Sequence, residues 1–240
     1  MIYEIPFTIY THLCDCQKQL SLQGIAQVLH EVAERHWTSL GVGMQQLNDK
    51  GQSRILSRVS YRVVSRYPKL NEQVKLRTWL HSCDGLLTLR ESEILSSMNE
   101  VLIAATSSWA IINIASRHAC RIREDLYDSC VFENRKALAI KPSKILMPDN
   151  LVDVVSFKAP YSSIDRNQHV YNAEYLRWIS NSLPDTLHRK TILGLDVNYN
   201  LETLPHEEVK ISQKLDGNQV WIQISNSRDV AVRSRVFLSE

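Results

Sequence analysis

The chain has 240 residues, enough for one large or two small domains with an extensive hydrophobic core. Hydrophobic residues make up 44% and charged residues 22%, with 7 Gly and 7 Pro, a composition that excludes disordered, collagen-like and low-complexity chains. The formal net charge of +2 argues against a dedicated nucleic-acid-binding protein, so we expect no nucleic-acid partner.

The sequence also bears on the compartment. The first residues, MIYEIPFTIYTHLC, lack the basic start and apolar run of a signal peptide. The longest apolar stretch, residues 101–113, is too short and too polar to span a bilayer, so no membrane partner is expected. The five cysteines form no CxxC pair, which favours reduced thiols in the cytoplasm. Cys14 and Cys16 with His12 lack a second ligand pair, so we expect no metal.

The first half of the chain reads as one helix followed by a meander of strands. Apolar residues recur with the helical period from Ser21 to Gly41, with Ser21 as the expected N-cap and Gly41 as a left-handed C-cap. Gly24 lies inside this helix, and we expect it to mark a close approach to a sheet. Strand patterns follow over residues 55–64, 74–80, 86–95 and 101–112, with a hairpin turn at Asp84-Gly85. This order is typical of an α+β fold.

The same plan begins again after a polar linker. Residues 127–150 are rich in polar and turn residues, which places a boundary there between domains 1–140 and 151–240. A strand is expected over residues 154–161, and then a helix over 172–183 that is capped by Asn172 and ended by Pro184. Further strands are expected over residues 193–201, 209–215, 220–225 and 230–238, with a second hairpin turn at Asp216-Gly217.

The two halves align at an offset of 150 residues. Residues 15–21 (DCQKQLS) lie over residues 165–171 (DRNQHVY), and both halves have the same order of elements. We therefore interpret the chain as a duplication. The aligned segments differ chemically at two positions, where Gln17 and Gln19 stand against Asn167 and His169.

The densest polar segment of the second half comes just before its helix. Asp165, Asn167 and His169 alternate along it, and in an extended run this spacing would point all three side chains to one side. A carboxylate, an amide and an imidazole can together supply a base, a hydrogen-bond donor and an orienting partner. Turns before helices use the same residue types, so the spacing alone favours a polar turn with a surface histidine.

A resemblance to a known family changes this balance. Residues 163–184, SIDRNQHVYNAEYLRWISNSLP, resemble the second-half signature of the acyl-ACP thioesterases of plants and bacteria, D-x-N-x-H-V-x-N-x-x-Y-x-x-W. Residues 105–113, ATSSWAIIN, resemble the A-T-S-x-W-x-x-x-N strand of the family's first half, and residues 29–33, LHEVA, lie in the matching helix. The resemblance runs from about Tyr10 to Phe237.

The resemblance implies an α+β double hotdog, a tandem fold in which each half is a long helix wrapped by an antiparallel β-sheet. It also implies four catalytic residues, namely Asp165, Asn167, His169 and Glu202. Glu202 matches a glutamate on the strand after the helix, which a tyrosine, here Tyr199, precedes by three residues. Plant members carry a cysteine next to this glutamate, whereas this chain has a threonine there and no later cysteine, which excludes a cysteine nucleophile in the second half.

The implied chemistry is thioester hydrolysis. Glu202 is the expected general base on water, and Asn167 would position the water or polarise the carbonyl. His169 would donate a hydrogen bond to the reacting group or hold Glu202, and Asp165 would orient the other two. Direct attack by a carboxylate to give an anhydride is an open alternative. Should Glu202 not be the base, the next candidates are Asp165, Glu207 and Glu208.

Three functions follow from these expectations. The first is an acyl-ACP thioesterase without a cofactor, which hydrolyses fatty acyl-acyl carrier protein to free fatty acid and holo-ACP and binds the acyl chain in its first half. The others are a hydrolase of acyl-CoA or another thioester, and a non-catalytic acyl-binding module. Two basic clusters could face an acidic carrier protein, although solvated surface is the favoured interpretation of both. They are Arg117, His118, Arg121 and Arg123, and His188, Arg189 and Lys190. The sequence leaves a homodimer open.

Overall fold

The computed structural model describes residues 1–122 and 130–240; Arg123 of the first basic cluster and residues 127–129 of the expected linker lie outside them. The first half contains β1 (Tyr3–Thr8), α1 (Leu22–Ser39), α2 (Met44–Asn48), β2 (Gln52–Val63), β3 (Gln73–Cys83), β4 (Leu87–Ser96), β5 (Val101–Asn113) and β6 (Ala119–Cys120). The second half contains β7 (Val152–Lys158), α3 (Asn172–Ser182), β8 (Ile192–Tyr199), β9 (Glu208–Asp216), β10 (Gln219–Asn226) and β11 (Val230–Leu238). The repeated plan of a helix followed by a meander is confirmed.

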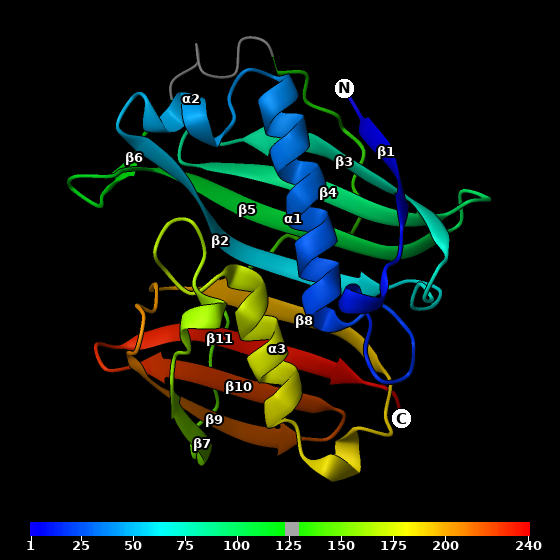
Figure 1. The fold of residues 1–240 in the computed structure, drawn as a ribbon, viewed down its shortest axis with the longest axis vertical. Coiled ribbons are helices and arrows are strands. Elements are labelled where there is room, and N and C mark those ends of the chain that lie inside the picture. Colours follow the sequence, from blue (N-terminus) through cyan, green and yellow to red (C-terminus); the bar gives the residue numbers. More distant parts are fainter. Residues whose placement is uncertain (123–129) are drawn as a thin grey trace.

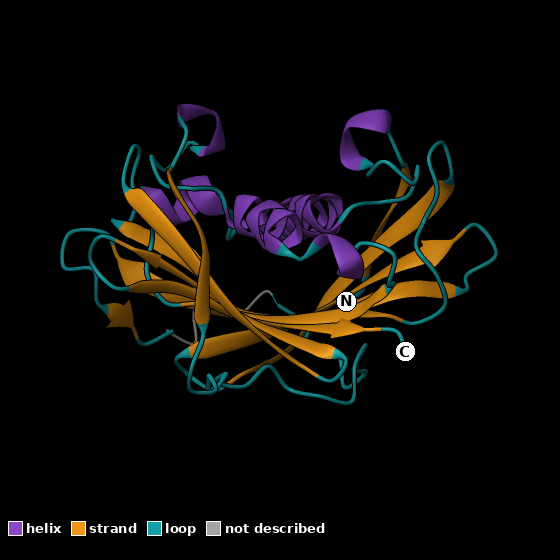
Figure 2. Cartoon of the chain, turned by 90° about the horizontal axis from the view of Figure 1, so that it is seen from below, coloured by secondary structure: helices purple, strands orange, loops and turns teal. Residues whose placement is uncertain are grey.

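The strands form one continuous sheet that spans both halves. Their order is β1-β3-β4-β5-β2-β8-β11-β10-β9-β7, with β6 paired to β5 and every pairing antiparallel. The halves meet where β2 pairs with β8, with Val59 opposite Val197 and Tyr61 opposite Leu195. Both long helices lie side by side against the same concave face of the curved sheet (Figures 1 and 2). The expected double hotdog is confirmed.

Local signals set the ends of α1. The Ser21 side chain accepts a hydrogen bond from the Gly24 amide at 3.0 Å, and Gly41 adopts φ +73° directly after the helix. Gly24 does mark a close approach, but not to a sheet. A Cβ atom at this position would lie 2.4 Å from the carbonyl oxygen of Leu13, which ends a short 3-10 helix at the start of the chain.

The expectation that Asn172 caps α3 is wrong. Tyr171 is the N-cap residue, and its side chain makes no capping hydrogen bond. The reason lies in the duplication, because Tyr171 occupies the place that Ser21 has in the first half. The Tyr171 amide donates to the carbonyl oxygen of Ser163, and the Ser21 amide donates to that of Leu13, so each residue is bound to the preceding 3-10 helix. This backbone hydrogen bond to the preceding 3-10 helix therefore sets where α3 begins, even without a capping side chain.

The two Asp-Gly hairpin turns are confirmed. Gly85 and Gly217 adopt φ +85° and +57°, in the left-handed region that glycine tolerates best. The Asp84 side chain accepts the backbone amides of Leu86 and Leu87 at 3.1 and 2.7 Å. Because β3 continues through Cys83, the first turn is shorter than the expected turn over residues 81–85.

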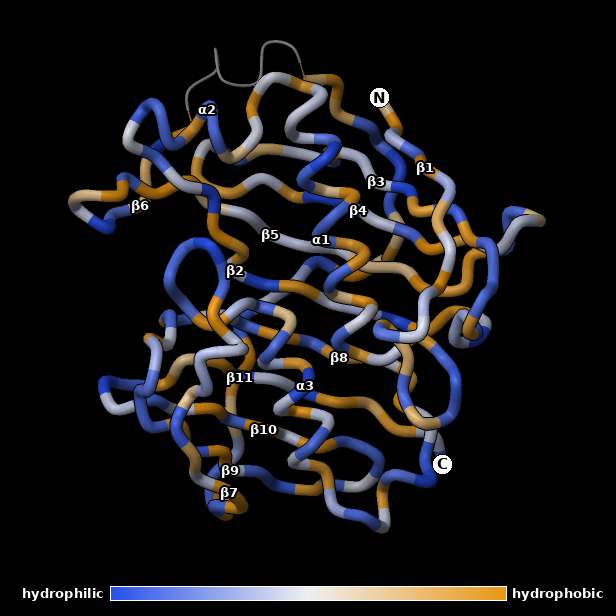
Figure 3. Tube along the Cα trace, in the orientation of Figure 1, coloured by the Kyte–Doolittle hydropathy of each residue, from blue (hydrophilic) through white to orange (hydrophobic). Residues whose placement is uncertain are grey.

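The core is shared between the halves. One cluster of buried apolar side chains runs from α1 across β2 and β8 to α3 and β11, and apolar residues recur along the strands of both halves (Figure 3). The two helices are also linked by a hydrogen bond of 2.6 Å from the Gln23 amide group to the Glu174 carboxylate. In the described part of the chain, no helix is both long and apolar enough to cross a lipid bilayer.

Candidate active site

The segment before α3 is a tight turn. The Asp165 side chain accepts the backbone amide of Asn167 at 2.8 Å, and the Asp165 amide donates to the carbonyl oxygen of His169 at 2.8 Å. Gln168 adopts φ +64°, which turns the chain back on itself. The polar turn that the spacing favours is therefore present, and the three residues do not form an extended run. The Asp165 carboxylate binds the backbone of the turn that carries Asn167 and His169.

The first half contains the same turn. The Asp15 side chain accepts the amide of Gln17 at 2.8 Å, and Lys18 adopts φ +59° at the position that matches Gln168. The 3-10 helices Thr11–Leu13 and Tyr161–Ser163 precede the two turns. The backbone is thus common to both halves, and side chains alone give the second turn its chemistry.

Glu202 lies beside the second turn. It belongs to the loop after β8 rather than to a strand, because β8 ends at Tyr199. The backbone amide of Val170 donates to the carbonyl oxygen of Thr203 at 2.9 Å, and the Asn226 side chain donates to the Glu202 carbonyl at 3.0 Å. The first bond holds the Glu202 loop against the end of the turn, and the second ties it to the last residue of β10. Thr203 is fully buried.

The carboxylate of Glu202 has positively charged neighbours. Arg117, which follows β5 in the other half, forms an ion pair with it, and the Arg228 guanidinium lies 3.6 Å away. Burial raises the pKa of Glu202, but its own backbone amide and the charges of Arg117, His169 and Arg228 outweigh burial and leave this pKa below its ordinary value. Glu202 is therefore ionised near neutral pH, as a general base must be.

Tyr199 links β8 to the start of α3. Its phenol donates a hydrogen bond to the carbonyl oxygen of Asn172 at 3.2 Å, and its ring lies 6.0 Å from that of Tyr175. Burial raises the pKa of Tyr199 well above its usual range, so the phenol stays protonated. The tyrosine thus ties the end of β8 to the first residue of α3.

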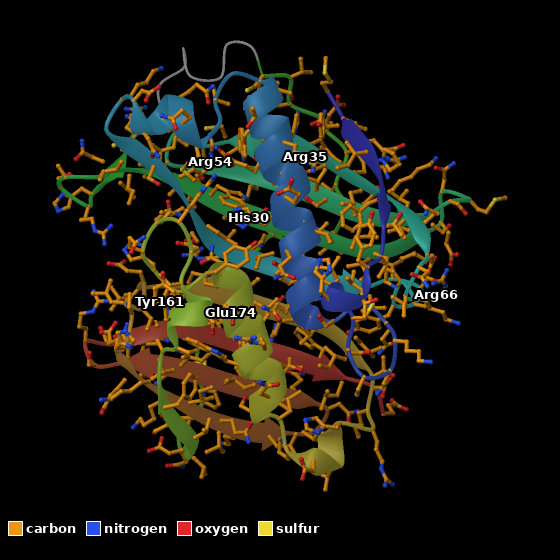
Figure 4. All side chains as sticks on the ribbon, in the orientation of Figure 1. His30, Arg35, Arg54, Arg66, Tyr161 and Glu174 are labelled. Carbon is orange, nitrogen blue, oxygen red and sulfur yellow. The ribbon has the colours of Figure 1, made fainter. Side chains whose placement is uncertain are left out.

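A histidine from the first half lies against the second turn. His30 lies on α1 (Figure 4). Its ring stacks on Tyr171 with ring centroids 5.6 Å apart and lies 5.7 Å from that of Trp109. Arg166 of the turn lies 3.6 Å from Glu34, one helical turn further along α1. Burial lowers the pKa of His30, so its imidazole is neutral near neutral pH. The turn is therefore docked on the helix of the opposite half.

A cavity of about 30 Å³ adjoins this histidine. Asn172 and Ala173, at the start of α3, line it on one side, and His30 lines it from α1. Residues of β2, β4 and β5, further residues of α1, and Tyr199 of β8 form the rest of its wall. The cavity thus lies between the turn of the second half and the core of the first half.

These groups suit the hydrolysis of a carbonyl compound. An ionised carboxylate can take a proton from water, while an amide and an imidazole can donate hydrogen bonds to a developing oxyanion. Among the alternative bases, Glu207 is already occupied, because it accepts hydrogen bonds from the Leu204 amide at 2.8 Å, the Ser227 hydroxyl at 2.7 Å and the Arg228 guanidinium at 2.9 Å. Glu208 is exposed on β9. Glu202, which lies beside the turn, stays the predicted base.

Three neighbours of the site were not assigned to it from the sequence, namely His30, Arg117 and Arg228. Arg117 was placed in a basic cluster on the surface, and no local pattern connects any of the three with Glu202 or the turn. In the second basic cluster, the Lys190 ammonium donates to Asn218 at 3.0 Å and to the Ser239 carbonyl at 3.2 Å. Within residues 1–122 and 130–240, no group of three His, Cys, Asp or Glu side chains is placed to hold a metal ion.

Comparison with known families covers most of the chain. Residues 1–130 match the acyl-ACP thioesterase N-terminal domain, and residues 149–233 match the acyl-ACP thioesterase C-terminal domain. Relatives include oleoyl-acyl carrier protein thioesterase 1 of Arabidopsis thaliana, 25% identical over 214 residues (81% of this chain, 59% of the relative). The palmitoyl-acyl carrier protein thioesterase of Gossypium hirsutum is 26% identical over 198 residues (77% and 48%). The chain thus spans about half to three fifths of the length of these chloroplastic relatives.

Solved structures agree with the observed fold. An acyl-ACP thioesterase from Bacteroides thetaiotaomicron superposes with a TM-score of 0.91 at 24% identity, covering 99% of this chain and 98% of the other. The 12:0-ACP thioesterase from Umbellularia californica superposes with a TM-score of 0.85 at 18% identity, covering 99% and 97%. The tandem architecture is shared along the whole length of these chains.

Proposed function

Because the chain belongs to the acyl-ACP thioesterase family, we propose that it hydrolyses the thioester of an acyl-acyl carrier protein to a free fatty acid and the carrier thiol. The observation that carries this proposal is the ionised Glu202 beside the turn that holds Asp165, Asn167 and His169. A purely acyl-binding module would need no such set of groups. The acyl-ACP substrate named for the relatives supplies the carrier in this proposal.

The reaction assigns one role to each of these residues. Glu202 removes a proton from water, and the water oxygen attacks the thioester carbonyl carbon. Asn167 and His169 donate hydrogen bonds to the oxygen that becomes negatively charged. The carbon–sulfur bond then breaks, the thiolate of the carrier takes up the proton, and Glu202 returns to its ionised form. Asp165 holds the turn and touches no reacting atom in this scheme.

The two halves divide the work in this proposal. Residues 151–240 carry the catalytic groups, and residues 1–140 bind the acyl chain in the cavity beneath α1. Two observations support the division: Asn172 lines that cavity directly after the turn, and His30 of α1 contacts Tyr171. In the first half, Gln17 and Gln19 occupy the matching turn, and a neutral amide cannot act as a base near neutral pH.

A thioesterase assay tests the function. The purified protein is given the same acyl chain on acyl carrier protein and on coenzyme A, and the release of free thiol is followed. We expect turnover on the carrier protein with the larger kcat/KM. Equal values on both carriers would point to a general thioester hydrolase. Tight acyl binding without any turnover would point to a binding module and contradict the proposal.

The attacking group can be identified separately. A single turnover in ¹⁸O water labels the released fatty acid if water attacks directly, with the protein unlabelled. If a carboxylate attacks to form an anhydride, water that opens the anhydride at the enzyme carbonyl leaves the label in the protein. Mass spectrometry measures the label in both products, and label in the protein identifies the anhydride route.

A further inference from the structure

The sheet beneath α1 has a polar floor in the first half. The Arg90 guanidinium is buried there and donates to the Thr78 hydroxyl at 2.9 Å, with the His36 ring nitrogen Nδ1 3.0 Å from the same guanidinium nitrogen. The hydroxyls of Thr78 and Ser92 lie 3.0 Å apart and share a hydrogen bond. Both hydroxyl residues are buried as well. A cluster of buried, hydrogen-bonded polar groups therefore faces the helix. A plain hydrocarbon chain bound there would be more stable against apolar walls.

The far side of this floor is closed by a stack of charged and aromatic groups. The guanidinium carbon of Arg54 lies 3.8 Å from the centre of the Trp37 ring, and that of Arg90 lies 4.1 Å from it. Arg54 also donates to the carbonyl oxygen of Val42 at 2.8 Å. Moving either guanidinium to make room for a longer ligand would break cation–π contacts and hydrogen bonds in a desolvated place.

The duplicated framework does not require this polarity. In the second half, the matching strands β10 and β11 contribute Ile222, Ile224, Val232 and Val236 to the shared apolar cluster, with Ser234 also buried on β11. In the first half, β4 and β5 place Arg90, Ser92 and Ser107 in the wall of the cavity. The polar groups are thus a property of this cavity and not of the fold.

The cavity is also small. Its volume of about 30 Å³ corresponds to the space of about two water molecules. A long saturated chain would have to displace packed side chains and cover polar groups without replacing their contacts, which is costly for both reasons. A short acyl group displaces fewer side chains, and an oxygen atom at its far end can accept hydrogen bonds from the floor in place of the contacts it covers.

We propose that the cavity beneath α1 selects a short acyl group that carries a hydrogen-bond acceptor oxygen, as a keto or carboxylate group, at the end far from the thioester. Arg90 and Ser92 would contact that oxygen, while Ser107, whose hydroxyl donates to the Arg90 carbonyl oxygen and accepts from the Trp109 indole, lines the wall beside them. The inference rests on the proposed thioesterase activity and specifies its substrate class. It makes the far end of the acyl group, rather than its length alone, the feature that is recognised.

A panel of thioesters on one carrier tests the inference. Butyryl, acetoacetyl, succinyl, octanoyl and palmitoyl thioesters are compared by kcat/KM. We expect acetoacetyl or succinyl to exceed butyryl by about tenfold or more, the scale of one hydrogen bond to a buried charged group, and the two long chains to be poorer still. A preference for octanoyl or palmitoyl overturns the inference and leaves the proposed activity standing. Hydrolysis of none of the five contradicts the proposed activity itself.

Variants control for differences in the intrinsic reactivity of the thioesters. For each protein, the kcat/KM of an oxygenated substrate is divided by that of the butyryl substrate, and this ratio is compared between the variant and the unaltered protein. Arg90→Met should lower this ratio about 10- to 100-fold, and Ser92→Ala should lower it several-fold. Ser60→Ala is the matched control, a buried serine on β2 that lines the opposite face of the sheet, and its ratio should not change. Unchanged ratios in Arg90→Met and Ser92→Ala overturn the inference.

A binding measurement keeps the test decisive if Arg90→Met does not fold. Calorimetry then compares succinate and butyrate binding to the unaltered protein and to Ser92→Ala. Tighter binding of succinate that weakens in Ser92→Ala supports the inference. Equal binding of the two acids to the unaltered protein overturns it.

Discussion

Arg117 and Glu202 form an ion pair across the two halves of the molecule, although 85 residues separate them in the chain. Arg117 follows a strand of the half that contributes no catalytic residue in the proposed reaction, yet its guanidinium contacts the proposed general base. The first half therefore contributes to the electrostatics of the site as well as to its cavity. This relationship leads to a test of the role of Glu202 by pH.

Replacing Arg117 by glutamine should move the acid limb of the kcat/KM profile to higher pH. The positive charge favours the ionised carboxylate, so its removal raises the pKa of Glu202, and the active, ionised base is then lost at a higher pH as the solution is acidified. Near neutral pH both proteins hold Glu202 ionised, so kcat should differ there by less than about threefold, as expected for an exposed ion pair. Arg189→Gln removes an exposed positive charge elsewhere and is the control. Superimposable acid limbs in all three proteins would show that Glu202 does not set this limb.

Glu202→Gln should lower kcat by about 10²- to 10⁴-fold, the usual contribution of a general base, with little change in KM. The amide keeps the size of the side chain but cannot accept the proton from water. Steady-state kinetics with one acyl thioester, together with circular dichroism, separate this effect from unfolding. Glu208→Gln alters an exposed carboxylate on β9 and should stay close to the unaltered enzyme. A near-normal kcat for folded Glu202→Gln would remove Glu202 from the site and favour Asp165 as the reacting carboxylate.

The two matching turns allow a paired test of where catalysis occurs. His169→Ala should lower turnover about 100-fold or more, because an oxyanion donor is lost. Gln19→Ala changes the matching position of the first half and should leave turnover within several-fold. Both variants keep the aspartate that holds each turn, so both should fold. Equal losses from the two substitutions would show that the first turn also takes part in the reaction.

Gly24→Ala should destabilise the protein by about 1–3 kcal/mol, the typical cost of overpacking. The new Cβ atom would lie 2.4 Å from the Leu13 carbonyl oxygen and 2.8 Å from the Leu20 side chain, although alanine favours a helix. Urea unfolding measures the loss. Glu31→Ala, at an exposed position of the same helix, should change the free energy of unfolding by less than about 0.5 kcal/mol. A Gly24→Ala protein as stable as the original would mean that the 3-10 helix moves away without cost.

Much of the fold could be predicted because its signals are local. The apolar period and the caps of α1 depend on residues within a few turns of the helix, and each Asp-Gly pair determines its hairpin by the backbone freedom of one glycine. The repeated Asp15 and Asp165 segments showed the duplication directly. The local capping rule failed at α3. Asn172 is a residue type that often caps helices, but the preceding turn already places the helix start at Tyr171.

The surroundings of the candidate site could not be predicted in this way, because they are made by contacts between distant segments. The residues Asp165, Asn167, His169 and Glu202 were proposed from the sequence motif, and their catalytic roles stay predictions. That Arg117 pairs with Glu202, and that His30 stacks on Tyr171, depends on how β2 joins β8 and how the two helices lie together on one sheet. The polar floor around Arg90 is of the same kind. Its residues alternate with others along ordinary strands, and only the folded sheet decides that their side chains face the cavity, because strand register and twist set which face each one occupies.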